Sequence, residues 1–251
     1  VYQSGREERG SELYFVREHA GQGGQGDLYR VAETQEGEGS FALKMMRLSG
    51  ADHKKRRENL KSLVLETEIA VRVGSHVNLA VILDFFETPI FAGLEQYAIV
   101  TEYVEGGMDL EGYMGGDKYD GTGELYQSGE TREAVSDRIV SIMLQIFRAL
   151  EHVHARGVLH CDLKPPNVMI TRDRSTIKVI DWGCASISED SPSWPIEGDE
   201  TAAAAAAAIP RAPFTGGTAL WRSPEQAKLC NERPTGRSQL LSPATSDLWA
   251  A

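Results

Sequence analysis

The stretch VLHCDLKPPNVMI, residues 158–170, decides how this sequence is interpreted. It carries four polar side chains at short spacings: His160, Asp162, Lys164 and Asn167. In phosphoryl transfer, a carboxylate orients the attacking hydroxyl, a cation neutralises the transferred phosphate and an amide holds a metal ion. Asp162, Lys164 and Asn167 supply these three groups in that order. The stretch therefore predicts a loop that catalyses phosphoryl transfer.

A glycine-rich run lies far upstream of this loop. AGQGGQGDLYRV, residues 20–31, places Gly21, Gly23 and Gly26 in the G-x-G-x-x-G spacing. That spacing alone is weak, because it also occurs in dinucleotide-binding folds, where it opens a helix. Here the glycines lie between two strand-like runs. We therefore expect a hairpin that folds over phosphates, with Leu28 covering a purine.

Lys44 stands within the apolar run FALK, where a buried ammonium is unfavourable unless it meets anions. Two glutamates on the next helical pattern compete to pair with it, Glu66 and Glu68. The helical face of Glu66 also carries the apolar Ile69, whereas Glu68 shares its face with Arg72. The pattern favours Glu66 as the partner of Lys44.

Two motifs follow the catalytic-loop pattern. In VIDWGCA, Asp181 comes directly after an apolar strand and offers a carboxylate suited to Mg²⁺. Further on, GGTALWRSPEQ contains a G-T-x-x-W-R-x-P-E pattern that ends at Glu225.

In this order and spacing, the motifs resemble those of eukaryotic protein kinases of the serine/threonine type, from about residue 13 to the last residue. The resemblance implies an α+β, bilobal protein-kinase fold. Residues 1–104 would form a small five-stranded sheet plus helix, and residues 105–251 a mainly helical lobe. It also implies that MgATP binds in the cleft and that its γ-phosphate passes to a hydroxyl of a protein substrate.

The resemblance assigns a role to individual residues. The implied catalytic residues are Lys44, Glu66, Asp162 and Lys164, and the implied metal ligands are Asn167 and Asp181. Thr218 would pair with Asp162 and Lys164 and help to seat the substrate hydroxyl. The implied nucleotide-binding residues include a small gatekeeper and a hinge: Gly21, Gly23, Gly26, Leu28, Ala42, Lys44, Thr101, Glu102, Val104 and Met169.

The loop departs from the family at Cys161, which stands where an arginine is expected. That arginine holds a phosphate on the activation segment through charge-assisted hydrogen bonds, which a thiol cannot make. We therefore expect activity that is constitutive or gated by a partner protein. Trp182 and Ser223 replace the phenylalanine and alanine usual at their positions, which the family tolerates.

The sequence ends at SDLWAA, where the family pattern continues. Asp247 would open a central hydrophobic helix that anchors the catalytic loop, with further helices behind it. We expect the second lobe to be truncated near the start of this helix and to expose an apolar floor.

Composition limits the function classes. The 251 residues carry a net charge of −11, which argues against a basic nucleic-acid-binding surface. The sequence contains no run of 18 or more apolar residues, so we expect no membrane-spanning segment in it. The three cysteines, Cys161, Cys184 and Cys230, show no disulfide or zinc spacing, so we expect an intracellular, cytoplasmic or nuclear protein.

Hydrophobic periodicity predicts the secondary structure. A first helix is expected over residues 54–73 and a second one after residue 130, stopped by Gly157. Its buried stripe would be Ile139, Ile142, Ile146, Leu150 and Val153. Residues 201–210 are alanine-rich and suggest an insertion. The expected strands cover residues 12–16, 27–33, 40–48, 80–86, 97–103, 167–170 and 177–180.

Two other functions compete with a protein kinase. A pseudokinase that binds ATP or acts as a scaffold usually lacks Lys44, Asp162 or Asp181, and all three are present. A small-molecule phosphotransferase of the aminoglycoside-kinase type shares the His-x-Asp loop, but Lys164 and the Ser-Pro-Glu segment argue against it.

Overall fold

The computed structural model forms two compact units. Residues 1–67 and 80–105 form the first unit, and residues 68–79 and 106–251 form the second. The sequence pattern placed one boundary after residue 104 and did not indicate that residues 68–79 cluster with the second unit. The structure describes residues 2–3, 13–23, 26–36, 40–47, 65–91, 94–105, 107–115, 123–126, 129–187, 217–224, 226–227 and 247.

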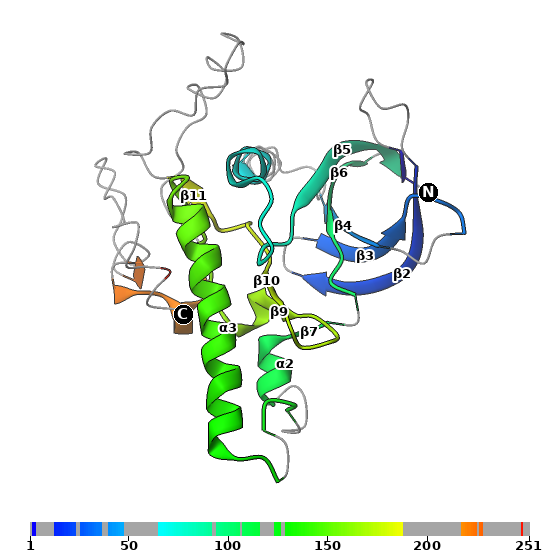
Figure 1. Ribbon diagram of the computed structural model, residues 1–251. Helices are drawn as coiled ribbons and strands as arrows, with labels where there is room; N and C mark the ends of the chain where they lie inside the picture. Colours follow the sequence, from blue (N-terminus) through cyan, green and yellow to red (C-terminus); the bar gives the residue numbers. More distant parts are fainter. Residues whose placement is uncertain are drawn as a thin grey trace. The chain divides into compact units, whose positions relative to one another are not determined.

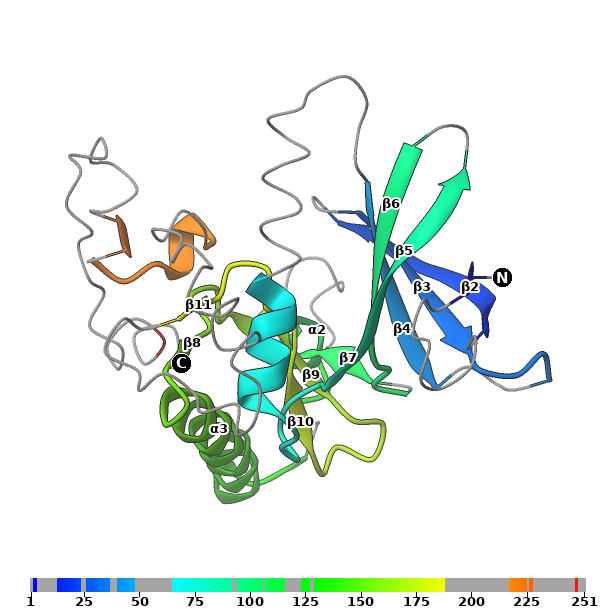
Figure 2. The same cartoon turned by 90° about the horizontal axis from the view of Figure 1, so that it is seen from above.

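The first unit is built on one antiparallel sheet with strand order β1-β2-β3-β4-β6-β5. Figures 1 and 2 show the strands side by side in a curved layer. The five expected strands are confirmed, and the two-residue β1 adds a sixth. The strands are β1 (Tyr2–Gln3), β2 (Leu13–Gly23), β3 (Gly26–Ala32), β4 (Phe41–Arg47), β5 (Ile82–Phe91) and β6 (Leu94–Glu102).

One face of this sheet carries the core of the first unit. Apolar side chains alternate along the strands, as expected when one face is buried. The rings of Tyr14 and Phe86 are stacked with their centroids 5.7 Å apart. The buried cluster consists of Tyr14, Val31, Leu43, Met45, Phe86, Ala98 and Val100.

The second unit contains a long helix, two short sheets and several short turns. Helix α3 (Arg132–His154) is capped at its N-terminus by Thr131, whose hydroxyl accepts the Ala134 amide. Strands β10 (Ile177–Val179), β9 (Val168–Ile170) and β7 (Met108–Asp109) form one sheet, and β11 (Ser186–Ile187) pairs with β8 (Val158–Leu159). The shorter helical elements are α2 (Leu110–Met114), η3 (Pro165–Asn167) and η4 (Ala219–Trp221).

Helix α3 confirms most of the expected stripe, because Ile142, Ile146, Leu150 and Val153 are buried. The expectation for Ile139 is wrong, since this side chain is 38% exposed. Ile139 lies on the same helical face as the buried residues. However, Gln145, which contacts β10 by accepting the Ile177 amide, lies almost two turns further along the helix, so Ile139 lies beyond this contact. The helix ends before Gly157, which has a φ of 69°.

The remaining helical expectation is only partly described. Residues 65–73 are helical and are divided between the two units, whereas residues 54–64 lie outside the described residues. The alanine-rich residues 201–210 also lie outside them. No helix in the described part of the chain is long and apolar enough to span a membrane.

Candidate active site

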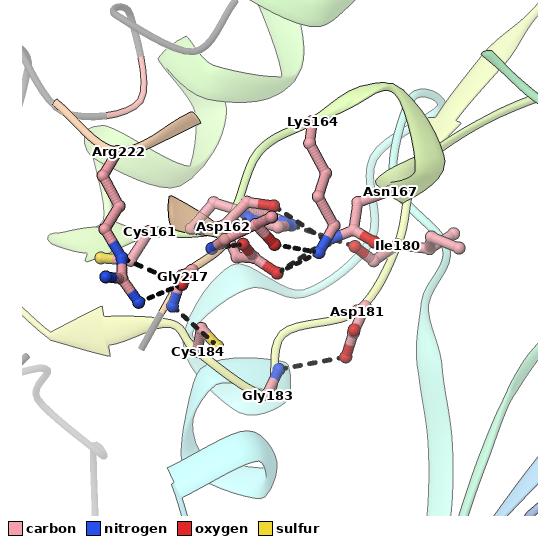
Figure 3. A network of polar contacts seen from close by, with 12 residues as sticks. Cys161, Asp162, Lys164, Asn167, Ile180, Asp181, Gly183, Cys184, Gly217 and Arg222 are labelled. Carbon is pink, nitrogen blue, oxygen red and sulfur yellow. Dashed lines mark hydrogen bonds and ion pairs between the residues drawn. The ribbon is translucent and has the colours of Figure 1, made fainter. Parts of the chain in front are cut away.

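The loop between β8 and β9 brings together Asp162, Lys164 and Asn167, the residues expected to act in phosphoryl transfer. Asp162 is only 8% exposed. Lys164 donates from Nζ to Asp162 Oδ2 over 2.7 Å, and the Thr218 backbone amide donates to Asp162 Oδ1 over 2.6 Å. Figure 3 shows the Lys164 side chain pointing toward Asp162. Each carboxylate oxygen therefore has a donor that fixes its orientation.

Thr218 connects the segment of residues 217–227, here called the later segment, to the same loop. The Lys164 ammonium donates a second hydrogen bond, of 2.6 Å, to Thr218 Oγ1. Asp162, Lys164 and Thr218 thus form a closed polar cluster, in the arrangement that the family resemblance implies for Thr218.

Asn167 lies at the end of the short helical turn η3. Its Nδ2 donates to the Asp162 carbonyl over 2.8 Å and lies 3.3 Å from Asp162 Oδ2. The Ile180 amide donates to the Asn167 carbonyl over 3.0 Å, which holds the residue before Asp181 against Asn167. Asp181 is exposed and has a φ of 63°, a conformation that non-glycine residues rarely adopt. The two expected metal ligands therefore lie on segments that are hydrogen-bonded to each other.

Cys161 is held mainly by its backbone, while its thiol donates a long hydrogen bond of 3.8 Å to the Leu159 carbonyl. Its φ is 62°, and its amide donates to Asp247 Oδ1 over 2.8 Å. The other oxygen of Asp247 accepts the His160 amide at the same distance. Gln226 donates from Nε2 to the Cys161 carbonyl over 3.0 Å. The residue before Asp162 is thus clamped from both sides.

The Cys161 side chain is buried and neutral. Only 3% of the residue is exposed. Burial, together with the charge of Asp247, raises the pKa of the Cys161 thiol far above its ordinary value. At neutral pH this position therefore carries no charge.

Gln226 is a functional candidate that the sequence does not indicate. It ends the GGTALWRSPEQ run, but no pattern in the sequence gives a glutamine there a role. Its contact with Cys161 joins residues 65 positions apart, so only the folded chain reveals it.

Gly217, the first residue of the later segment, makes two further contacts near this loop (Figure 3). The Gly217 amide donates to Cys184 Sγ over 3.4 Å. Arg222 donates from Nε and from its terminal nitrogen to the Gly217 carbonyl, over 3.0 and 2.6 Å. Cys161 and Arg222 line the same small hollow beside Asp162.

In the first unit, the Lys44 ammonium lies 3.8 Å from Glu66 Oε1, within ion-pair distance. Glu66 is only 3% exposed, so its carboxylate is largely withdrawn from water. Glu68 instead pairs with Arg72 one helical turn away, at 2.8 Å. The structure therefore places Glu66, and not Glu68, beside Lys44.

The expected nucleotide residues of the first unit lie on one face of the sheet. Leu28 is opposite Lys44, and Ala42 is opposite Thr101. Opposed residues in an antiparallel pair point to the same face, as do residues two apart in a strand. All four therefore lie on the face opposite the apolar core.

The glycine run forms the expected hairpin. Gly21 is opposite Leu28, and Gly23 is opposite Gly26 at the end of β2 and β3. Glu102 ends β6, where its amide donates to the Val81 carbonyl over 3.0 Å, and Val104 follows two residues later.

Met169 belongs to the second unit. It lies in β9 opposite Lys178 of β10 and is half-buried. The adenine contact expected of it stays a prediction, as do the nucleotide-binding roles of the first-unit residues.

Comparison with known proteins identifies the family. The model of the protein kinase domain matches residues 14–250. The serine/threonine-protein kinase KSP1 of Saccharomyces cerevisiae is 33% identical over 129 residues, which is 50% of this chain and 10% of the relative. A probable serine/threonine-protein kinase of Streptomyces coelicolor is 31% identical over 222 residues, which is 88% of this chain and 27% of the relative.

A mammalian relative is similar over nearly the whole chain. The serine/threonine-protein kinase Nek1 of Mus musculus is 28% identical over 240 residues, which is 95% of this chain and 16% of the relative. The chain spans about a quarter or less of the length of these three relatives. Because the domain model covers nearly all of the sequence, the chain belongs to the protein kinase domain family.

Proposed function

We propose that this chain catalyses transfer of the γ-phosphate of ATP to serine or threonine hydroxyls of a protein substrate. The observation that carries the proposal is the Asp162 carboxylate, which Lys164 and the Thr218 amide hold by its two oxygens. A carboxylate fixed in this way can orient a substrate hydroxyl and accept its proton. Lys164 would neutralise charge on the transferred phosphoryl group.

The donor set fits a nucleotide-bound Mg²⁺. The Asn167 amide nitrogen donates to the Asp162 carbonyl, and no described residue donates to its Oδ1, which remains as a metal ligand. Asp181 adds an exposed carboxylate, and hard oxygen ligands are those that Mg²⁺ prefers. When bound, Mg²⁺ would neutralise charge on the phosphates.

The first unit fits the nucleotide itself. Lys44 would contact the phosphates, and Glu66 would fix the direction of its ammonium. A Cβ added at Gly21 would meet no atom of the described residues within 4 Å, so their packing does not require glycine there. A phosphate lying against the backbone would require it.

We further propose that activity does not depend on phosphorylation of the activation segment. The Cys161 thiol is buried and uncharged, so it cannot hold a phosphate. The nearby Arg222 already donates to the Gly217 carbonyl. The enzyme would therefore be constitutive or gated by a partner protein.

The catalytic proposal is tested with radiolabelled ATP, a generic protein substrate and an aminoglycoside in parallel. We expect label on serine or threonine of the protein only. Lys44→Met and Asp162→Asn should each abolish transfer, whereas the control Asp173→Asn changes an exposed carboxylate of the β9–β10 turn and should retain activity. Wild-type activity in Asp162→Asn would contradict the proposal, and nucleotide binding without transfer by the wild type would indicate a pseudokinase.

Control by phosphorylation is tested by phosphatase treatment of the full-length protein. Specific activity should be unchanged by the treatment. A loss of about tenfold or more (~1.4 kcal/mol of transition-state stabilisation), reversed by rephosphorylation between residues 186 and 218, would contradict this part of the proposal. Such a result would implicate another cation, with Arg222 the first candidate.

A further inference from the structure

Gln226 carries a buried carboxamide with both ends in use. The residue is 2% exposed. Its Nε2 donates to the Cys161 carbonyl over 3.0 Å, and its Oε1 accepts the Ser223 amide over 2.8 Å. The Ser223 hydroxyl in turn accepts the Gln226 amide over 3.2 Å. The hydrogen bonds with Ser223 therefore fix the Gln226 side chain locally, in the orientation in which it contacts the catalytic loop.

The carbonyl that Gln226 contacts belongs to the peptide bond between Cys161 and Asp162. Cys161 has a φ of 62°, which is strained for a residue with a side chain. A strained residue keeps such a conformation only where its surroundings hold it. Asp247 holds the amide of Cys161, and Gln226 holds the carbonyl. Gln226 thereby fixes the peptide plane from which the Asp162 side chain projects.

The same segment also contacts the Asp162 side chain. Thr218, eight residues before Gln226, donates its amide to Asp162 Oδ1 and accepts from Lys164. Among the described residues of the segment 217–227, Thr218 and Gln226 thus join it to the catalytic loop. Thr218 and Gln226 are both neutral residues, so these contacts join the segment to the loop without any phosphate. They can order this part of the segment although Cys161 lacks the positive charge of an arginine.

We propose that Gln226 is a positioning residue for the reaction, which sets the orientation of Asp162 through the Cys161 carbonyl and couples residues 217–227 to the catalytic loop. This inference rests on the proposed kinase function. It explains which contact substitutes for a phosphate anchor. Loss of the contact should lower kcat for the protein substrate more than it changes KM for ATP, because Asp162 acts on the hydroxyl.

The chain offers a matched control in Gln145. This glutamine also bridges segments of the second unit, since its Oε1 accepts the Asn78 side chain at 2.8 Å and the Ile177 amide at 3.0 Å. It lies on α3 and makes no described contact with the catalytic loop. Gln226→Met and Gln145→Met each replace a bridging amide by an apolar side chain of similar length. Both should lower the melting temperature of the full-length protein.

Only Gln226→Met should lower kcat, by about tenfold (~1.4 kcal/mol), while KM for ATP stays within about twofold of wild type in both variants. Gln226→Glu supplies a second readout. Its carboxylate cannot donate to the Cys161 carbonyl, whereas the protonated acid can, so its activity relative to wild type should rise as the pH falls from about 8 to about 6.

Hydrogen exchange of the amides in residues 158–167 provides a readout independent of activity. Exchange there should be faster in Gln226→Met than in wild type and unchanged in Gln145→Met. An active wild type with equal kcat and equal exchange in both variants would overturn the inference and leave the kinase function intact. An inactive wild type would overturn the kinase function, while the exchange experiment would still decide whether Gln226 fixes the loop.

Discussion

The Thr218 backbone amide lies 2.6 Å from Oδ1 of Asp162, although 56 positions separate the two residues in the sequence. The hydroxyl of Thr218 lies equally close to the Lys164 ammonium. One residue of the later segment therefore contacts both groups that would act on the substrate hydroxyl. The order of this segment and the geometry of the catalytic loop are linked at Thr218.

Thr218→Ala should lower kcat/KM for the protein substrate by about tenfold (~1.4 kcal/mol). The backbone amide remains, but Lys164 loses one of its two acceptors. Thr218→Ser restores the hydroxyl and should stay within about twofold of wild type. Steady-state kinetics with a peptide substrate measures the effect. Equal activity of the alanine and serine variants would show that the hydroxyl is not used.

Glu66→Gln should lower kcat/KM for ATP by about tenfold or more, because the amide cannot balance the charge of Lys44. Glu68→Gln is the matched control, two residues further along the same helix. It removes the pair with Arg72, for which a few tenths of a kcal/mol is typical. Kinetics at varied ATP concentration compares the two. A larger defect in Glu68→Gln than in Glu66→Gln would show that Glu68, and not Glu66, is the functional partner of Lys44.

Cys161 should react with an alkylating reagent at least about tenfold more slowly than Cys184 in the native protein. Burial raises the pKa of both thiols, but Cys161 is buried whereas Cys184 is partly accessible. Quenched labelling followed by peptide mass spectrometry measures the two rates separately. In denaturant the difference should disappear. Preferential labelling of native Cys161 would show that this loop opens readily.

Most of the fold could be predicted because its strands follow local rules. Short apolar runs bounded by glycines or charged residues mark β3 and β4, and the glycine hairpin between β2 and β3 lies where the G-x-G-x-x-G spacing predicts it. Ile139 could not be predicted, because periodicity identifies the face of a helix but not how far its neighbours extend. The clustering of residues 68–79 with the second unit likewise depends on tertiary contacts such as that of Asn78 with Gln145.

In the candidate site, too, residues close together in the sequence could be predicted, whereas the contact of Gln226 with a distant residue could not. Asp162, Lys164 and Asn167 lie within six positions, so one stretch indicates their chemistry. The preference for Glu66 over Glu68 came from helical periodicity, and the distance from Lys44 agrees with it. Gln226 could not be found, because a neutral amide carries no chemical signature and its partner is a backbone carbonyl. The left-handed conformation of Cys161 is equally invisible in the sequence.

Asp247→Asn should destabilise the protein at neutral pH by about 2 kcal/mol or more, because a buried amide group cannot accept the hydrogen bonds of His160 and Cys161 equally well.

Burial alone would raise the pKa of Asp247, but the hydrogen bond with His154 and those from the backbone amides outweigh it and lower the pKa. A lowered pKa means that the carboxylate stabilises the fold above its unfolded pKa of about 3.9, and that this contribution is lost as the pH falls through the folded pKa. The difference in unfolding free energy between wild type and Asp247→Asn should therefore narrow below about pH 4. Urea denaturation across this range measures it, with Asp137→Asn, an exposed carboxylate on α3, as the control that should resemble wild type. A difference that stays constant into strong acid would show that the charge of Asp247 does not hold the catalytic loop.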